Sequence, residues 1–389
     1  MYFEFMNKTK ICAGKNALSQ LNYECQQYHM KHPLIITDDV LYQLNYVRIL
    51  QKHLSIPYSL FTHVPVDSST EVVEEIKTFY IQEKCDGIIA LGGGSVLDTA
   101  KGVYLMISQQ CDRIQDIMGF EDLKVGLQVP FFAIPTTSGT GSEATCVAVV
   151  NDPHKHVKLE IISQHIQSDV AFLDPVFTIH LPLKTTASTS IDALVHAIEA
   201  YSCAGKNPIS DIYAISAISL ISTHLPKIIQ DPKDEDLRSQ LALASYLAGV
   251  AFSNSMVGIV HAIGHALGAV CHIPHGEAMS MLLIPCMRFN LSVNHELYGD
   301  LLLYLGKKEV YAKTPNEKRG EQAIVMIEEL LKQLHVSVGL PISLKSIETL
   351  HEHIEEIAEK ALNDGALLVN NRYTYKEDII SILEGQYGY

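Results

Sequence analysis

The pattern of apolar residues changes near residue 181, and this change constrains the fold more than any other feature of the sequence. Up to about residue 175, short apolar runs such as PLIIT (33–37), GIIAL (87–91) and FFAIP (131–135) alternate with helix-like stretches. Such alternation predicts a mostly parallel sheet flanked by helices. From about residue 186 onward almost every stretch has a helical pattern, with Pro and Gly between the stretches. We therefore expect an N-terminal α/β domain at residues 1–180 and an all-helical domain at residues 181–389.

Three further β-rich runs close the first domain, and the sequence leaves their pairing open. They are VAVVND (147–152), HVKLEII (156–162) and DVAFLDP (169–175), with Asn-Asp-Pro and Asp-Pro as turn signals. A hairpin beside the parallel sheet is one arrangement that this cluster allows.

Composition and charge argue against several classes of protein. The chain has 389 residues, a length typical of two domains, and 47% of them are hydrophobic, which is enough for a substantial core. It carries 29 Lys and Arg against 44 Asp and Glu, a net charge of -15. Such a charge repels phosphate backbones and anionic lipids, which argues against a nucleic-acid partner and against a role at a membrane surface.

The cysteines and the N-terminus indicate a reducing compartment. Eight cysteines are scattered along the chain without a Cys-x-x-Cys pair, and MYFEFMNKTK lacks the pattern of a secretion signal. One run, 257–274, approaches the length of a membrane span, but three histidines interrupt it, so we expect a buried helix there. The predicted location is the cytoplasm.

A glycine-rich turn follows the apolar run at 87–91. In GGGSVLDTAKG, Gly93 and Gly94 let backbone N–H groups approach a diphosphate closely, and the N-terminus of the following helix adds partial positive charge. Ser95 and Asp98 have the spacing of a capping box. A tight turn without a ligand is the alternative, because the motif differs from the G-x-G-x-x-G fingerprint.

A second loop, PTTSGTGSEAT (135–145), is dense in hydroxyl groups and also follows a predicted strand. Thr136, Thr137 and Thr140 are candidates for donating to phosphate or ribose, and Ser142 is expected to cap the next helix. An ordinary loop is the alternative for this stretch alone. Two such loops after two strands of one sheet favour a nucleotide.

Asp38 lies just past the run at 33–37. A carboxylate there could accept hydrogen bonds from both ribose hydroxyls of an adenosine and repel a 2′-phosphate, which favours NAD over NADP. A solvated turn or a helix cap involving Asp38 and Asp39 is an equal alternative.

The second domain carries an acid and several imidazoles at helical spacing inside apolar sequence. Asp192 and His196 are four residues apart in IDALVHAIEA, so both project from one helix face. His261 and His265 repeat that spacing, and His275 lies in a turn expected to bring its imidazole back to the helix. One carboxylate and three imidazoles suit Fe(II) or Zn(II) and leave room for a substrate oxygen. For a single histidine a hydrogen-bonded core residue is the better interpretation, but several inside apolar helices favour a metal site.

Four motifs together resemble a known family. GGGSVLDTAK, PTTSGTGSEAT, DALVHAIEAY and VHAIGHALG…PHGEA occur in the order and spacing of the iron-containing (group III) alcohol dehydrogenases, and the resemblance covers essentially the whole chain. It implies a dehydroquinate synthase-like / iron-containing alcohol dehydrogenase fold, in which the α/β domain binds a dinucleotide and the helical domain binds a metal and the substrate. It also implies a homodimer or a larger homo-oligomer.

The resemblance further assigns roles to individual residues. It implies NAD(H) as the cofactor and Fe2+, or alternatively Zn2+, as the metal, with His265 as the catalytic residue near substrate and nicotinamide. The implied metal ligands are Asp192, His196, His261 and His275. The candidate cofactor residues are Asp38, Gly93, Gly94, Ser95, Asp98, Thr136, Thr137, Thr140 and Lys158.

Two departures from the family pattern concern the surroundings of the ligands. Residues 66–69 read Val-Asp-Ser-Ser where the family usually has Asn-Pro-Thr, and Glu277 replaces a commoner apolar residue. The second departure resembles relatives similar to 4-hydroxybutyrate dehydrogenases.

The sequence therefore predicts a metal-dependent, NAD(H)-linked alcohol dehydrogenase or aldehyde reductase that acts on a small primary alcohol or aldehyde by hydride transfer. A 4-hydroxybutyrate- or diol-type dehydrogenase of the same family is an alternative. A dehydroquinate-synthase-like lyase is a further one, although it would offer a Glu among lysines where Asp192 and His196 stand. A binding or scaffold protein with a vestigial site is the non-enzymatic alternative, against which the presence of all four ligands argues.

Overall fold

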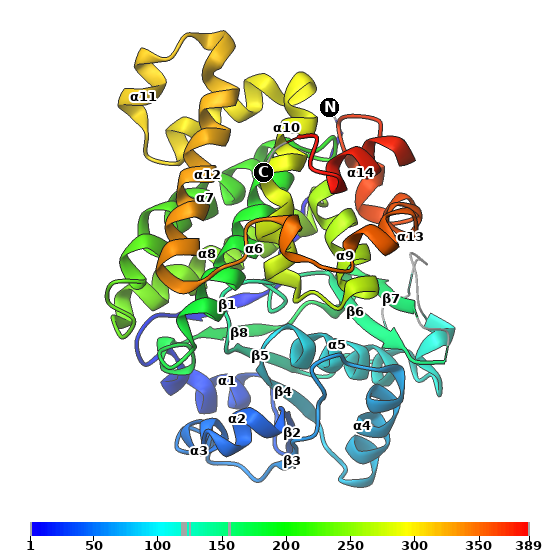
Figure 1. Cartoon of the computed structure of the whole chain (residues 1–389). Helices are drawn as coiled ribbons and strands as arrows, with labels where there is room; N and C mark the ends of the chain where they lie inside the picture. Colours follow the sequence, from blue (N-terminus) through cyan, green and yellow to red (C-terminus); the bar gives the residue numbers. More distant parts are fainter. Residues whose placement is uncertain (1, 118–122, 124–125, 155–156, 388–389) are drawn as a thin grey trace. The chain divides into compact units, whose positions relative to one another are not determined.

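The computed structural model describes residues 2–117, 123, 126–154 and 157–387, without the side chains of residues 157 and 158. The chain forms two compact units, whose elements are labelled in Figure 1. Residues 6–181 form the sheet unit, and residues 182–389 together with residues 1–5 form the helical unit. Each unit has a hydrophobic core of its own.

The sheet unit is built on parallel strands. Their order is β1-β8-β5-β4-β2-β3, and every neighbouring pair is parallel. The strands are β1 (Lys10–Ala13), β2 (Pro33–Ile36), β3 (Ser59–Phe61), β4 (Gly87–Gly92), β5 (Phe131–Pro135) and β8 (Val170–Leu173). This arrangement confirms the parallel α/β sheet that the alternating pattern predicts.

The strand order reverses beside β2. The chain runs outward from β2 to β3 and then returns to β4 on the other side of β2. In open α/β sheets, ligands bind outside the carboxyl ends of the strands at such a reversal. The ends of β2 and β4 are therefore the expected ligand position in this unit.

The three β-rich runs that close the first domain divide between two sheets. The first two form β6 (Val147–Asp152) and β7 (Val157–Ile162), which pair as an antiparallel hairpin, and the third forms β8 inside the parallel sheet. The sequence pattern does not predict β1, because this short strand at the edge of the sheet is mostly exposed and lacks an apolar run.

Helices cover both faces of the parallel sheet. They are α1 (Leu21–Gln27), α2 (Asp39–Gln43), α3 (Tyr46–Gln51), α4 (Thr70–Gln82) and α5 (Gly94–Gln109). Successive side chains of a strand point to opposite faces. Ile88 and Ala90 of β4 therefore pack in one core with α4 and α5. Ile89 and Leu91 pack in a second core with α1, α2 and α3, which gives three layers.

The described residues of the helical unit form helices and no strand. The α-helices are α6 (Leu183–Ser202), α7 (Pro208–Ile228), α8 (Glu235–Ser253), α9 (Ile259–Cys271), α10 (His275–Tyr304), α11 (Lys308–Lys313), α12 (Arg319–Val338), α13 (Leu350–Leu362) and α14 (Lys376–Leu383). Short 3₁₀ helices are η1 (Ala17–Gln20), η2 (Ile114–Ile117), η3 (Gln164–Ile166) and η4 (Pro175–Phe177) in the sheet unit, and η5 (Asn316–Lys318), η6 (Leu344–Ser346) and η7 (Gly365–Val369) in the helical unit.

The helix α6 runs through the core of the helical unit. Its side chains from Ser190 to Ser202 are all buried, and it packs against α7, α8 and α10. A helix that is buried on all sides must supply a partner for every polar group it carries. Asp192 and His196 lie in this buried part. Their polar atoms therefore need partners within the helical unit or from a bound ligand.

Two sequence-based expectations about the chain as a whole can be compared with the structure. No helix in the described part of the chain has the length and apolar character needed to cross a bilayer, and the run at 257–274 contains α9 and the turn after it. All eight cysteines are free thiols.

Candidate metal centre and cofactor loops

The four predicted metal ligands come from three helices of the helical unit. Asp192 and His196 lie on α6 and are 2% and 5% exposed. His261 lies in the first turn of α9 and is also buried. His275 is the first residue of α10, and 39% of its side chain is exposed. The cluster is thus closed on one side by α6 and α9 and more open at the start of α10.

A close approach of two backbones brings α10 to α6. A Cβ atom on Gly276 would lie 2.6 Å from the carbonyl oxygen of Ser188, one turn before Asp192 on α6. Only glycine permits this approach, because a side chain would overlap the oxygen. His275, the neighbour of Gly276, is thereby set beside Asp192.

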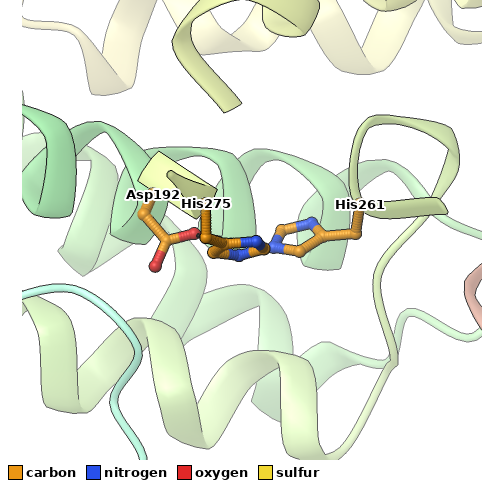
Figure 2. Close-up of side chains that lie close together, drawn as sticks. All are labelled: Asp192, His261 and His275. Carbon is orange, nitrogen blue, oxygen red and sulfur yellow. Dashed lines mark ion pairs between the residues drawn. The ribbon is translucent and has the colours of Figure 1, made fainter. Parts of the chain in front are cut away.

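Three of the predicted ligands converge in the structure. Asp192 Oδ1 lies 3.2 Å from His275 Nε2 and 3.8 Å from His261 Nε2. One donor atom from each residue lies within 4.8 Å of the other two, a spacing that allows one ion to contact all three. Figure 2 shows the carboxylate and the two rings close together, with the ring of His261 approaching from the side opposite Asp192.

His196 lies next to this group, but it is not one of the residues whose donor atoms all lie within 4.8 Å of one another. Its Nδ1 is 3.8 Å from Asp192 Oδ1. Its ring stacks on both Phe252 and His261, with a centroid separation of 4.3 Å in each case. The structure thus brings the fourth predicted ligand to the edge of the cluster.

The cluster contains buried polar atoms that have no hydrogen-bond partner among the described residues. They are Asp192 Oδ1, His196 Nδ1 and His261 Nε2. Buried polar atoms are nearly always paired, because leaving one unpaired costs about 1–3 kcal/mol. A divalent cation beside His275 would satisfy Asp192 Oδ1 and His261 Nε2 at once, and one carboxylate with imidazoles suits Fe(II) or Zn(II). The residues present therefore fit the predicted metal.

The electrostatic environment of the cluster keeps His196 neutral and Asp192 ionised, which are the states in which both can bind a cation. Burial lowers the pKa of His196 to about 3, which keeps its imidazole neutral and able to bind a cation. Burial acts to raise the pKa of Asp192, but the imidazoles of His196 and His275 outweigh it and hold that pKa well below its usual range. Burial acts to lower the pKa of His261, but the carboxylates of Asp192 and Glu199 raise it to about 9. His261 therefore carries a proton that a cation must displace.

Glu199 is a site residue that the sequence analysis missed. Its Oε2 accepts a hydrogen bond from Nδ1 of His261 at 2.6 Å, and its Oε1 accepts one from the backbone N–H of Val260 at 2.7 Å. A carboxylate on one imidazole nitrogen orients the other nitrogen toward a metal. The signal was present in the sequence, because Glu199 lies three residues after His196 on the same helix.

The predicted catalytic residue, His265, lies one turn after His261 on α9, and 30% of its side chain is exposed. Its Nδ1 donates to Asp364 Oδ2 at 2.8 Å. Its ring centroid lies 5.4 Å from that of His275 and 5.8 Å from that of His261. The sequence analysis did not identify Asp364, because the residue is 99 positions away and its local pattern carries no signal.

In the sheet unit, α5 begins directly after the glycine turn. Gly93 is its N-cap and Gly94 its first residue, no side chain caps the helix, and no acidic residue lies in its first turn. The first N–H groups of a helix need partners from outside the helix. An anion such as a diphosphate fits this position, because these N–H groups and the helix dipole both attract it.

The predicted capping box of Ser95 and Asp98 is wrong. The helix begins before Ser95, whose hydroxyl donates instead to the carbonyl oxygen of Val66. Asp98 accepts hydrogen bonds from Ser142 Oγ at 2.6 Å and from the backbone N–H of Val149 at 3.1 Å. The expected helix after Ser142 is also wrong, because the chain turns there and enters β6. Asp98 thus ties α5 to the second loop and to the hairpin.

The hydroxyl-rich loop after β5 lies against the glycine turn. A Cβ atom on Gly93 would lie 3.4 Å from Thr137 Cγ2, and one on Gly94 would lie 2.9 Å from Thr140 Cγ2. Thr136 is the first residue after β5 and is buried. The structure therefore brings the two predicted loops together at the carboxyl ends of adjacent strands.

Asp38 also lies at this edge of the sheet, just past β2. Its Oδ1 accepts a hydrogen bond from the backbone N–H of Leu41 at 2.8 Å, so it forms the helix cap that the sequence allowed as an alternative. Asp39 pairs at the surface with His63 at 3.0 Å. Lys158 lies in β7, and its side chain falls outside the described part of the structure.

At both departures from the family pattern, a side chain contacts residues of its own unit. Glu277, in the first turn of α10, forms an ion pair with Lys184 at 2.6 Å. Ser69 caps α4 by accepting a hydrogen bond from the backbone N–H of Val72 at 3.4 Å.

Sequence comparison with known families covers nearly all of the chain. Residues 8–175 match the family described as "Iron-containing alcohol dehydrogenase", and residues 186–387 match "Fe-containing alcohol dehydrogenase family, C-terminal". The chain belongs to the iron-containing alcohol dehydrogenase family. This result confirms the resemblance drawn from the four motifs and the predicted class of enzyme, an oxidoreductase of the alcohol dehydrogenase type.

Several members of the iron-containing alcohol dehydrogenase family match over nearly their full length. The NAD-dependent methanol dehydrogenase of Bacillus methanolicus is 33% identical over 374 residues, which cover 95% of this chain and 96% of that protein. A crystal structure of 1,3-propanediol oxidoreductase matches with a TM-score of 0.93 and 31% identity over 100% of both chains. Sulfoacetaldehyde reductase from Bifidobacterium kashiwanohense in complex with NAD+ matches with a TM-score of 0.87 and 25% identity over 99% of this chain and 98% of that one. These matches confirm the predicted fold.

Proposed function

We propose that this chain is a metal- and NAD(H)-dependent dehydrogenase that interconverts a small primary alcohol and its aldehyde. The proposed metal ligands are Asp192, His196, His261 and His275. The observation that carries the proposal is the group of unpaired, buried donor atoms on α6 and α9. The names of two relatives, an NAD-dependent methanol dehydrogenase and a 1,3-propanediol dehydrogenase from Klebsiella pneumoniae, support NAD(H) and a short alcohol or diol.

The chemistry divides between the bound groups and the chain. When bound, the metal supplies a Lewis acid for the alcohol or aldehyde oxygen, and the nicotinamide accepts or supplies the hydride. Fe2+ is the proposed metal, and Zn2+ is the alternative that the same donor set accepts. Glu199 holds His261 so that Nε2 faces Asp192. His265 accepts the hydroxyl proton of the alcohol at Nε2 and returns it in the reverse direction, a role suited to imidazole near neutral pH.

The proposed cofactor site is the carboxyl edge of the parallel sheet. Backbone N–H groups in the uncapped first turn of α5 bind the diphosphate. Asp98 holds the second loop against α5 through Ser142, and Thr140 accepts a hydrogen bond from the backbone N–H of Ser142 within that loop. Asp38 disfavours a 2′-phosphate on the adenosine ribose. Gly93, Gly94, Ser95, Thr136, Thr137 and Lys158 complete the proposed set.

We further propose a cytoplasmic location and a homodimer or larger homo-oligomer. The free thiols support a reducing compartment. The oligomer is expected from the family resemblance, and light scattering of the purified protein measures it directly.

Elemental analysis of the purified protein together with a substrate screen tests the proposed function. The screen offers NAD(H) and NADP(H) with short primary alcohols, diols, glycerol, 4-hydroxybutyrate and the corresponding aldehydes. We expect stoichiometric iron or zinc, and a substrate-dependent change in NADH absorbance that chelation abolishes and metal restores. A metal-loaded protein that changes NADH absorbance with none of these substrates contradicts the proposal. Formation of dehydroquinate from its sugar-phosphate precursor would establish the lyase alternative instead.

A further inference from the structure

Asp364 contacts the predicted catalytic histidine from a segment near the C-terminus. Its Oδ2 accepts a hydrogen bond from Nδ1 of His265 at 2.8 Å, and its Oδ1 accepts one from the backbone N–H of Ala366 at 2.8 Å. The second contact caps η7. The side chain of Asp364 is 12% exposed. Each carboxylate oxygen thus has a different partner, the imidazole on one side and its own segment on the other.

The segment at 364–371 is fixed at its other end. Asn370 exchanges hydrogen bonds with Asn290 of α10 at 2.8 and 3.2 Å. Asn371 donates to the carbonyl oxygen of Ser202, the last residue of α6, at 2.7 Å. The segment is therefore anchored to α6 and α10, two of the three helices that carry proposed metal ligands, so the position of the Asp364 carboxylate is fixed.

The ring of His265 is bounded on other sides by two proposed ligands. It stacks on His275 at an interplanar angle of 20° and meets His261 edge-on at 66°. Turning the ring over about its Cβ–Cγ bond would place a carbon atom against Asp364 and lose the hydrogen bond. An ionised carboxylate only accepts hydrogen bonds, so Nδ1 carries a proton, and in the neutral imidazole Nε2 has the lone pair.

We propose that Asp364 is a positioning residue that holds His265 in the Nδ1–H tautomer, with Nε2 ready to accept the hydroxyl proton of the alcohol. This inference rests on the proposed function, in which His265 is the proton acceptor. In the oxidation step the O–H proton bonds to Nε2 and its electron pair forms the C=O bond, while the hydride leaves carbon for the oxidised nicotinamide. The Nε2–H tautomer has no lone pair at that nitrogen and does not perform the step.

The substitution Asp364→Asn tests the inference with little change in shape. Asn caps helices as well as Asp does, so the contact with Ala366 persists, while the amide N–H2 now faces His265 and donates to Nδ1. We expect the metal-loaded enzyme to lose about 10–100-fold in kcat, the usual effect of removing such a carboxylate, with little change in KM. Asp234→Asn is the matched control, because Asp234 caps α8 through the backbone N–H of Leu237 at 2.9 Å, and it is expected to leave kcat unchanged.

A double-mutant cycle with His265→Gln separates positioning from a general structural role. If Asp364 acts through His265, the two residues are coupled, and D364N changes kcat by less than about twofold once His265 is replaced in the H265Q background. An equal loss of kcat in both backgrounds would show that Asp364 only holds its segment, and would overturn the inference. So would a D364N enzyme with unchanged kcat.

Histidine 15N NMR of the zinc-loaded protein supplies a readout that does not depend on turnover. The His265 signals are assigned by their loss in H265Q. We expect the proton on Nδ1 in the wild type and in D234N, and on Nε2 in D364N; the same tautomer in D364N as in the wild type overturns the inference. If the tautomer switches as expected but the wild type oxidises no alcohol, the proposed function fails while the control of the His265 tautomer by Asp364 stands.

Discussion

The metal-ligand cluster of the helical unit and the loops at the edge of the sheet unit differ in how their polar side chains are satisfied. In the cluster, polar atoms of Asp192, His196 and His261 are buried and lack hydrogen bonds among the described residues. In the loops, the candidate side chains of Ser95 and Asp98 are already bonded to protein groups. In the sequence, both regions carry polar residues in a regular pattern.

From this difference we expect the two proposed sites to bind their ligands through different parts of the chain. A buried polar atom without a hydrogen bond favours a partner from outside the protein, so we expect the cluster to bind through its side chains. Where the side chains are paired with one another, the uncapped N–H groups at the start of α5 remain for the ligand. Substitutions in the cluster should therefore greatly reduce metal binding and kcat, whereas substitutions of the hydroxyl groups in the loops should change NADH affinity only slightly.

The largest effect is expected for Asp192→Asn. The carboxylate is the group that His196, His261 and His275 share, and the neutral amide would remove its charge from the metal. We expect loss of bound metal and a fall in kcat of about 1000-fold or more, because a Lewis acid contributes several kcal/mol. Elemental analysis and NADH absorbance measure both effects. Full metal content in this variant would contradict the ligand assignment.

Glu199→Gln is expected to weaken the metal site without destroying it. The amide can still accept from the backbone N–H of Val260, but its N–H2 opposes the Nδ1–H of His261 and disfavours the tautomer that leaves Nε2 for the metal. Metal affinity should fall about 10–100-fold, measured by competition with a chelator. Glu328→Gln is the control, because Glu328 pairs with Arg288 elsewhere in the helical unit. Equal metal affinities in the two variants would show that Glu199 does not support the metal site.

Metal affinity should also depend on pH, and cofactor affinity should not. The pKa of His261 is raised to about 9, so below that pH a proton occupies the imidazole and a cation must displace it. The dissociation constant for zinc is expected to fall about tenfold per pH unit between pH 7 and pH 9 and then to level off. The two cofactor loops contain no histidine, so NADH binding should lack this slope. A flat zinc profile would contradict the prediction.

In the cofactor loops, Gly94→Ala is expected to have the larger effect. The added methyl group would lie 2.9 Å from Thr140 Cγ2 and push the two loops apart. Such overpacking costs about 1–3 kcal/mol, so NADH affinity should fall roughly tenfold, with metal content unchanged. Adding Thr140→Ser, which removes the methyl group in the way and keeps the hydroxyl, should restore most of the affinity. No rescue would mean that the spacing of the loops is not the cause.

The smallest effect is expected for Ser95→Ala. Its hydroxyl donates to the carbonyl oxygen of Val66, so the group proposed to contact the cofactor is its backbone N–H, which alanine retains. NADH affinity should change less than about twofold, within the range for removing a group that does not contact the ligand. A tenfold loss, measured by NADH fluorescence titration, would show that the hydroxyl reaches the cofactor and that the contrast between the two sites is weaker than proposed.

The sequence alone predicted those features that depend on local periodicity. Alternating strands and helices predicted the parallel sheet, and the four-residue spacing placed Asp192 and His196 on one helix face, because the helical repeat is a local property. The sequence also placed both loops after strands of one sheet, and the structure adds that the loops meet, because a Cβ atom on Gly94 would touch Thr140.

Tertiary structure decided which polar groups meet one another. Glu199 reaches His261 across 62 residues, and Asp364 reaches His265 across 99. The helical spacing places Glu199 near His196 on α6 but does not identify His261 as its partner, and the local pattern around Asp364 gives no signal. Tertiary structure also decided against the local capping signal at Ser95, because the helix begins at Gly94 and the Ser95 hydroxyl donates to the carbonyl oxygen of Val66. Periodicity sets the direction of a side chain along its own element, whereas its partner depends on how distant elements pack together.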